Sequence, residues 1–133
     1  MLIPAIHYPG TCADAMALYK NALGAEVISV AHNKDAPPDS PMRAAERNPN
    51  HVMHAELMIA GTLMNMCDVP DGVASGNMHL FNVFFDTVDE VIAAYHHLSL
   101  GGRIITELGP QFWSAMYADV EDRFGVHWQL MAK

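Results

Sequence analysis

The feature that most constrains this fold is one short pattern that occurs twice along the chain. The stretches TCADAMALYKNALGAEVI (11–28) and TVDEVIAAYHHLSLGGRI (87–104) each open with threonine and carry a carboxylate three residues later. Thr11 and Thr87 lie 76 residues apart (87 minus 11), and Tyr19 and Tyr95 have the same separation. This spacing indicates an internal duplication, so we expect the chain to fold as two similar units.

Each of the two stretches predicts an α-helix. Thr11 with Asp14, and Thr87 with Glu90, match the capping-box pattern at a helix start, with Asp replacing Glu in the first pair. Apolar residues then recur at helical spacing, namely Ala15, Leu18 and Ala22 in the first stretch and Val91, Ala94 and Leu98 in the second. Glycine follows each stretch near its end, as is usual at helix C-termini.

Strand-like segments surround both helices. One segment rich in branched or aromatic residues precedes each helix and three follow it. The predicted strands are 2–8, 26–32, two strands within 51–70 hinged at Gly61–Thr62, 78–86, 103–107, 113–120 and 126–131. Each half is therefore strand, helix, strand, strand, strand. We predict one α+β domain over residues 1–133, with module one at 1–70, module two at 77–133 and the helices outside curved sheets.

Composition narrows the class of partner. The formal net charge of −8 argues against nucleic acid, whose binding is dominated by basic contacts to phosphate. No apolar run is long enough to span a bilayer, so we expect no membrane partner. The first ten residues lack the basic residues and cleavage site of a signal peptide. Two cysteines make no disulfide framework, which favours a reduced cytoplasmic protein.

Motifs in a fixed order accompany the repeat. They are Gly10–Ala15, Leu18–Lys20, Leu23–Gly24, Met53–Leu57, Ile59–Gly61, Asp68, Gly101–Gly102, Phe112–Trp113, Asp122–Val126 and Trp128. Together they resemble the PhnB-like branch of the glyoxalase/bleomycin resistance/dioxygenase superfamily, also called the vicinal oxygen chelate superfamily. The resemblance implies two βαβββ modules that form a cup-shaped, partly closed sheet around a cavity, usually in a homodimer. It implies no single reaction, because one fold hosts many functions.

The resemblance also implies where a divalent metal ion would bind. Its ligand positions fall on Pro4 and Leu80 in the first strands of the modules and on Gln129 in the last strand. Neither Pro4 nor Leu80 has a side chain that coordinates metal, and His79, one residue from Leu80, is expected on the opposite face of the sheet. We therefore expect no metal cofactor. If a divalent ion does bind, Gln129 and His54 are the best candidate ligands.

Alternation along the strands predicts which side chains line the cavity. Ala55, Leu57 and Ile59 suit packing against a helix, as do their counterparts in the second half. The predicted cavity residues are His54, Glu56, Met58, Asn82, Phe84, Trp113, His127 and Gln129. A mostly apolar wall with a few polar groups is typical of small-molecule sites. The alternatives are structural, since His54 and Glu56 are also expected to hydrogen-bond each other, and Trp113 to pack in the core.

Three functions fit these observations. The first is a cytoplasmic homodimer that binds a small, mostly apolar molecule, with no metal ion. The second is a metal-dependent isomerase, lyase or transferase of the superfamily. The third is a drug-sequestering protein of the bleomycin-resistance type, for which the net charge of −8 suits a cationic ligand. The sequence assigns no catalytic residue, and the loop 33–50 is either a lid or an arm exchanged between subunits.

Overall fold

The computed structural model describes all 133 residues, which divide into two compact units. The first unit contains residues 1–20 and 24–73, and the second contains residues 21–23 and 74–133. No helix of the protein is long and apolar enough to cross a membrane.

The two units repeat one order of elements. The first has β1 (Ala5–Tyr8), α1 (Cys12–Leu23), β2 (Glu26–His32), β3 (Val52–Ile59) and β4 (Thr62–Asp68), with short 3-10 helices at Asn33–Asp35 and Pro41–Arg43. The second has β5 (Phe81–Phe85), α2 (Val88–Ser99), β6 (Arg103–Gln111), β7 (Ser114–Glu121) and β8 (His127–Ala132). The predicted order and the α+β class are confirmed.

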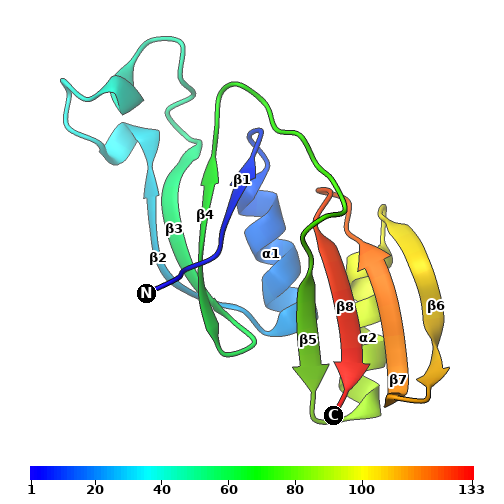
Figure 1. Cartoon of the computed structure of the whole chain (residues 1–133). Coiled ribbons are helices and arrows are strands. Elements are labelled where there is room, and N and C mark those ends of the chain that lie inside the picture. Colours follow the sequence, from blue (N-terminus) through cyan, green and yellow to red (C-terminus); the bar gives the residue numbers. More distant parts are fainter. The chain divides into compact units, whose positions relative to one another are not determined.

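The two sheets share one topology (Figure 1). Their strand orders are β1-β4-β3-β2 and β5-β8-β7-β6. In each sheet the first strand pairs parallel with the last strand of its module, and the other pairs are antiparallel. The parallel pair arises because the helix carries the chain from the first strand to the far edge of the sheet.

Helix α2 begins as the sequence predicts. The Oγ1 atom of Thr87 accepts a hydrogen bond from the backbone N–H of Glu90 at 3.2 Å. The same hydroxyl donates to the Glu90 carboxylate at 3.0 Å. This arrangement satisfies one of the backbone N–H groups that every helix start leaves without an intrahelical partner.

Helix α1 corrects the matching prediction for Thr11. The Thr11 side chain makes no capping hydrogen bond. Instead, Oδ1 of Asp68, at the end of β4, accepts from the backbone N–H groups of Gly10 (3.1 Å) and Cys12 (2.9 Å). Asp68 reaches them because it pairs with Tyr8, the last residue of β1. Asp68, which is distant in the sequence, thus supplies the capping hydrogen bonds that the local sequence predicted for Thr11.

Side-chain alternation gives each sheet one covered face. In the first unit Ala55 and Leu57 are fully buried, and the buried Tyr8 of β1 hydrogen-bonds its hydroxyl to that of Tyr19 on α1 at 3.0 Å. In the second unit α2 packs on β7 and β8, and Trp128 and Leu130 are buried there (Figure 1). We call these the helix-covered faces and the opposite ones the helix-free faces. The predicted alternation of burial is present in β3 and β5, whereas β8 is buried along its length except for the half-buried Gln129.

Strand β6 is longer than the predicted 103–107, since it continues to Gln111 and includes Gly109 and Pro110. Glycine and proline are depleted in strands, but β6 lies at the edge of its sheet, where a missing N–H group is tolerated. Its pairing with β7 shows three register shifts, which accommodate these residues.

Candidate functional site

A row of polar residues crosses the helix-free face of the second sheet. Asn82 on β5 pairs with Gln129 on β8, Gln129 pairs with Asp119 on β7, and Asp119 pairs with Thr106 on β6. Asn82 is exposed, Gln129 and Thr106 are half-buried, and Asp119 is buried. The register thus brings the predicted residues Asn82 and Gln129 side by side, with two polar neighbours that the sequence analysis did not single out.

An apolar row lies beside the polar row on the same face. Phe84 on β5 pairs with Met131 on β8, which pairs with Tyr117 on β7. Phe84 is 56% exposed, whereas Met131 and Tyr117 are buried. Burial, together with the nearby Asp119 carboxylate, raises the pKa of the Tyr117 phenol, which keeps it neutral. The predicted residue Phe84 therefore forms the exposed end of an otherwise buried apolar row.

Trp113 lies at the turn between β6 and β7. Its ring is edge-on to Tyr117 at a centroid distance of 5.3 Å and to Phe112 at 4.8 Å. The side chain is 51% exposed, so the alternative that it packs in the core is wrong. A turn at the sheet end cannot bury a side chain of this size on both sides. Trp113 instead extends the apolar row at Tyr117.

His127 and Asp119 form a buried polar pair on the same face. His127 Nε2 is hydrogen-bonded to Asp119 Oδ1, and only 9% of His127 and 7% of Asp119 are exposed. His127 Nδ1 is buried without a hydrogen-bond partner. The sequence analysis predicted His127 and missed Asp119. The available signal was an aspartate in the middle of a strand, where this residue type is depleted.

The first sheet carries a pocket of about 210 Å³. Its lining residues are Ala5, Ile6, His7, His54, Asn65, Met66 and Cys67. His54 was predicted, whereas His7, Asn65 and Cys67 were not, because no face was assigned to β1 and β4. Burial, with a contribution from Asp68, raises the pKa of the Cys67 thiol, so this cysteine is a poor nucleophile at neutral pH.

Glu56 and Met58, also predicted for the cavity, are half-buried neighbours of this pocket on β3 but do not line it. His54 Nε2 lies 3.6 Å from Glu56 Oε1, and both side chains are partly exposed. The two side chains are close, but this separation is longer than a hydrogen bond, so the structure shows no mutual hydrogen bond in a buried interior.

The metal position that the resemblance implies in the first strand of module one shifts by one residue. Tyr8 and Phe84 lie 76 residues apart, yet Tyr8 is buried on the helix-covered face and Phe84 is exposed on the helix-free face. By alternation, Ala5 and not Pro4 lies on the helix-free face of β1. Pro4 only accepts a backbone hydrogen bond from Asn65, at 2.9 Å.

The correction does not create a metal centre. Ala5 and Leu80 have no ligating atoms in their side chains. No group of three or more His, Cys, Asp or Glu side chains is arranged to hold a metal ion. Gln129 has Asn82 and Asp119 as its register partners, and Asp119 is already bonded to His127. These donors do not fit the three-ligand site that a catalytic divalent ion usually has.

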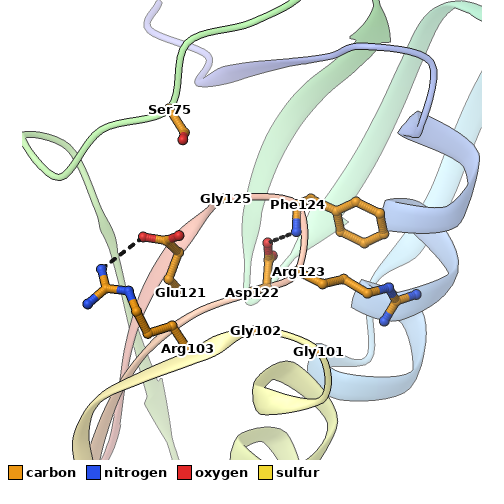
Figure 2. A pocket seen from close by; sticks show the side chains of 9 residues that line it. All are labelled: Ser75, Gly101, Gly102, Arg103, Glu121, Asp122, Arg123, Phe124 and Gly125. Atoms are coloured by element: carbon orange, nitrogen blue, oxygen red, sulfur yellow. Dashed lines mark hydrogen bonds and ion pairs between the residues drawn. The ribbon is translucent and has the colours of Figure 1, made fainter.

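A second hollow, of about 410 Å³, surrounds the turn between β7 and β8 (Figure 2). The Asp122 carboxylate builds this turn by accepting hydrogen bonds from the Phe124 and Val126 N–H groups and from the Trp128 indole. Figure 2 shows that the Arg103 and Arg123 side chains point away from each other, the first toward Glu121 and the second beside Phe124. The two guanidinium groups do not converge on a ligand, so the D-R-F-G motif here is structural.

Comparison with known proteins places the chain in a family. Residues 7–130 match the Glyoxalase/Bleomycin resistance protein/Dioxygenase superfamily. Protein YjdN from Escherichia coli is 30% identical over 137 residues, which cover 97% of this chain and 92% of YjdN. The chain therefore belongs to this superfamily.

Solved structures share the fold. Protein PA1353 from Pseudomonas aeruginosa is 24% identical, with a TM-score of 0.83 and coverage of 100% of this chain and 97% of that one. The PhnB protein from Bacillus cereus is 21% identical, with a TM-score of 0.80 and coverage of 99% and 98%. The fosfomycin resistance protein FosX from Listeria monocytogenes, in complex with Mn(II), is 13% identical, with a TM-score of 0.69 and coverage of 100% and 91%.

Proposed function

We propose that the protein binds a small, mostly apolar molecule on the helix-free faces of its sheets and that this binding needs no metal ion. The observation that carries the proposal is the second sheet, where an apolar row ending in exposed Phe84 lies beside a polar row ending in exposed Asn82. Small-molecule sites combine such an apolar surface with a few polar groups that fix orientation. The pocket beside His54 on the first sheet also has both apolar and polar lining residues.

Native mass spectrometry of the purified protein tests this function. We expect an organic molecule to co-purify and to be lost in Phe84→Asp, because a charge on the apolar row opposes apolar contact. Leu100→Asp is the matched control, since Leu100 is another exposed apolar residue, at the end of α2 (67% exposed, against 56% for Phe84). Retention of the molecule by Phe84→Asp, or loss in both variants, would contradict a site on this face.

The alternative, a metal-dependent isomerase, lyase or transferase, rests on Gln129 at the inherited ligand position. Metal content by mass spectrometry, after loading with Zn, Ni, Mn and Fe(II), decides between the two functions. We expect no near-stoichiometric ion, because two of the inherited ligand positions lack ligating side chains. A stoichiometric ion that is lost in Gln129→Ala or His54→Ala would establish the metalloenzyme and overturn the metal-free proposal.

The second alternative is drug sequestration of the bleomycin-resistance type, which the net charge of −8 favours for a cationic ligand. Calorimetric titration with a cationic glycopeptide of the bleomycin class tests it. The absence of any heat of binding would remove this function and leave the apolar-ligand proposal unaffected.

We also propose that the protein is a cytoplasmic homodimer. Support comes from exposed branched residues on the edge strands β2 and β6, among them Ile28 and Ile104, which a partner chain would cover. The two free cysteines are compatible with a reducing compartment. Sedimentation equilibrium is expected to give twice the chain mass of 14.6 kDa. A single chain mass over the whole concentration range would refute the dimer.

A further inference from the structure

We infer that the helix-free face of the second sheet binds a planar aromatic group that carries an uncharged or cationic hydrogen-bonding edge, such as a carboxamide or an amidine. The inference rests on the proposed function and names the class of ligand for one of its two faces. Three observations carry it: exposed aromatic rings, a pair of amide side chains without protein partners, and the lack of a free cation nearby.

The aromatic rings supply the apolar contact. Phe84 and Trp113 are each about half exposed, yet both belong to the apolar row, which has buried Met131 and Tyr117 between them. The Trp113 ring is edge-on to the buried ring of Tyr117 and to the exposed ring of Phe112. Exposed aromatic rings favour stacked or edge-to-face contact with a ring of the ligand. Such contact stabilises the complex by more than the burial of apolar surface alone.

The amide pair supplies the polar contact. Asn82 and Gln129 lie opposite each other in the β5–β8 register, and neither side chain hydrogen-bonds within the protein. Each carboxamide offers both a donor and an acceptor. Asn82 and Phe84 are two residues apart on one strand, so the polar and apolar rows lie roughly 7 Å apart. One aromatic ring with an attached carboxamide spans that separation.

This face offers no free cation to an anionic ligand. Beyond Gln129 lies the Asp119 carboxylate, which is bonded to His127, and farther along the same strand lies Glu121. The nearby cation, Arg103, is already paired with Glu121 at 3.1 Å. A carboxylate or phosphate on the ligand would therefore find no unpaired cation here, whereas a neutral amide or a cationic amidine does not need one.

Four small probes of nearly equal shape test the three requirements separately. Benzamide, benzamidine, benzoate and cyclohexanecarboxamide are titrated into the full chain, labelled with ¹⁵N. The signals followed are the Asn82 and Gln129 side-chain amides and the Trp113 indole. We expect benzamide and benzamidine to shift all three signals and benzoate to bind at least roughly tenfold more weakly. Cyclohexanecarboxamide is expected to bind about twofold to tenfold more weakly, since it lacks the ring.

Variants assign the binding to this face. Asn82→Leu keeps the size of the side chain and removes the amide, and it is expected to weaken benzamide binding about fivefold. Phe84→Leu is expected to weaken it by a similar factor, because it keeps an apolar side chain and removes the ring. Leu100→Ala, in the same unit, is the control and is expected to leave the affinity unchanged.

The outcomes separate this inference from the proposed function. Benzoate binding as tightly as benzamide, or an unchanged affinity in both Asn82→Leu and Phe84→Leu, would overturn the inference. Shifts confined to the first-sheet pocket at His54, or a co-purifying molecule that is neither aromatic nor bound near Trp113, would overturn it while the proposed function stands. If no probe binds and no molecule co-purifies, both fail.

Discussion

The hydrogen-bonded side chains of His127 and Asp119 are polar but almost completely buried. Asp119→Ala leaves the His127 imidazole buried without its partner, and Nδ1 already has none. We expect the free energy of unfolding, measured with urea, to fall by about 2–4 kcal/mol, because a buried polar group left without a hydrogen bond is costly. Asp86→Ala is the control, since Asp86 is exposed and paired with Lys133 at the surface. Equal effects of the two substitutions would argue against the buried pair as a source of stability.

Cys12 gives a pH dependence with a defined sign. Burial, with smaller contributions from Asp68 and Cys67, raises the pKa of the Cys12 thiol from 9.0 to about 12. Below about pH 9 the thiol is neutral in both states and has no effect on stability. Between about pH 9 and pH 12 only the unfolded state ionises, so stability falls as the pH rises. Urea unfolding of Cys12→Ala is expected to show a shallower loss from pH 9 to 11, with no difference in slope from pH 7 to 8. An unchanged slope above pH 9 would contradict this account.

At the scale of the element, the two helices have similar sequences at their starts but different caps. Thr87→Ala is expected to lower the free energy of unfolding by about 1 kcal/mol, because it removes the cap of α2. Thr11→Ala is expected to have little effect, since Thr11 makes no capping hydrogen bond. Thermal unfolding of the two variants makes the comparison. Equal losses would show that the Asp68 contacts do not replace the local cap of α1.

The connection after α2 requires glycine at position 102, because the backbone of β7 leaves no space for a side chain there. A Cβ atom at Gly102 would lie 2.2 Å from the backbone oxygen of Glu121 on β7, a distance that no side chain tolerates. Gly102→Ala is therefore expected to destabilise the second unit strongly, since backbone has to move. Gly76→Ala is the matched control, because nothing lies within 4 Å of its Cβ position and its φ is unstrained. Near-UV circular dichroism, which reports tertiary packing around Trp128, is the measurement; similar melting of both variants would refute the close approach.

At the scale of the whole molecule, the net charge predicts which charged surfaces the protein binds. Fifteen acidic residues against seven basic ones give the net charge of −8, and Arg103 and Arg123, at the hollow around the β7–β8 turn, point away from each other. The protein is expected to pass unretained through a heparin column at low ionic strength and to bind an anion exchanger, because like charges repel. Retention on heparin would reveal a basic surface that this charge distribution does not contain.

Much of the fold was readable from the sequence because its signals are local. The 76-residue repeat, the apolar spacing of Val91, Ala94 and Leu98, and the alternation in β3 reflect contacts between near neighbours along the chain. Those patterns determined the two modules, their element order and the burial of Ala55, Leu57 and Leu130. They also placed Asn82, Phe84 and Gln129 on one face, because alternation in a strand has a fixed period of two.

Only the tertiary structure decided which side chains of different strands and helices come into contact. The pairing of Asp119 with Gln129 and His127, and the capping of α1 by Asp68, depend on strand register and on residues far apart in the chain. The repeat spacing failed at Tyr8 and Phe84, because a shift of one residue in a strand moves a side chain to the opposite face. Sequence by itself thus determined the elements and their faces, while register, which is set by long-range hydrogen bonds, decided which side chains meet.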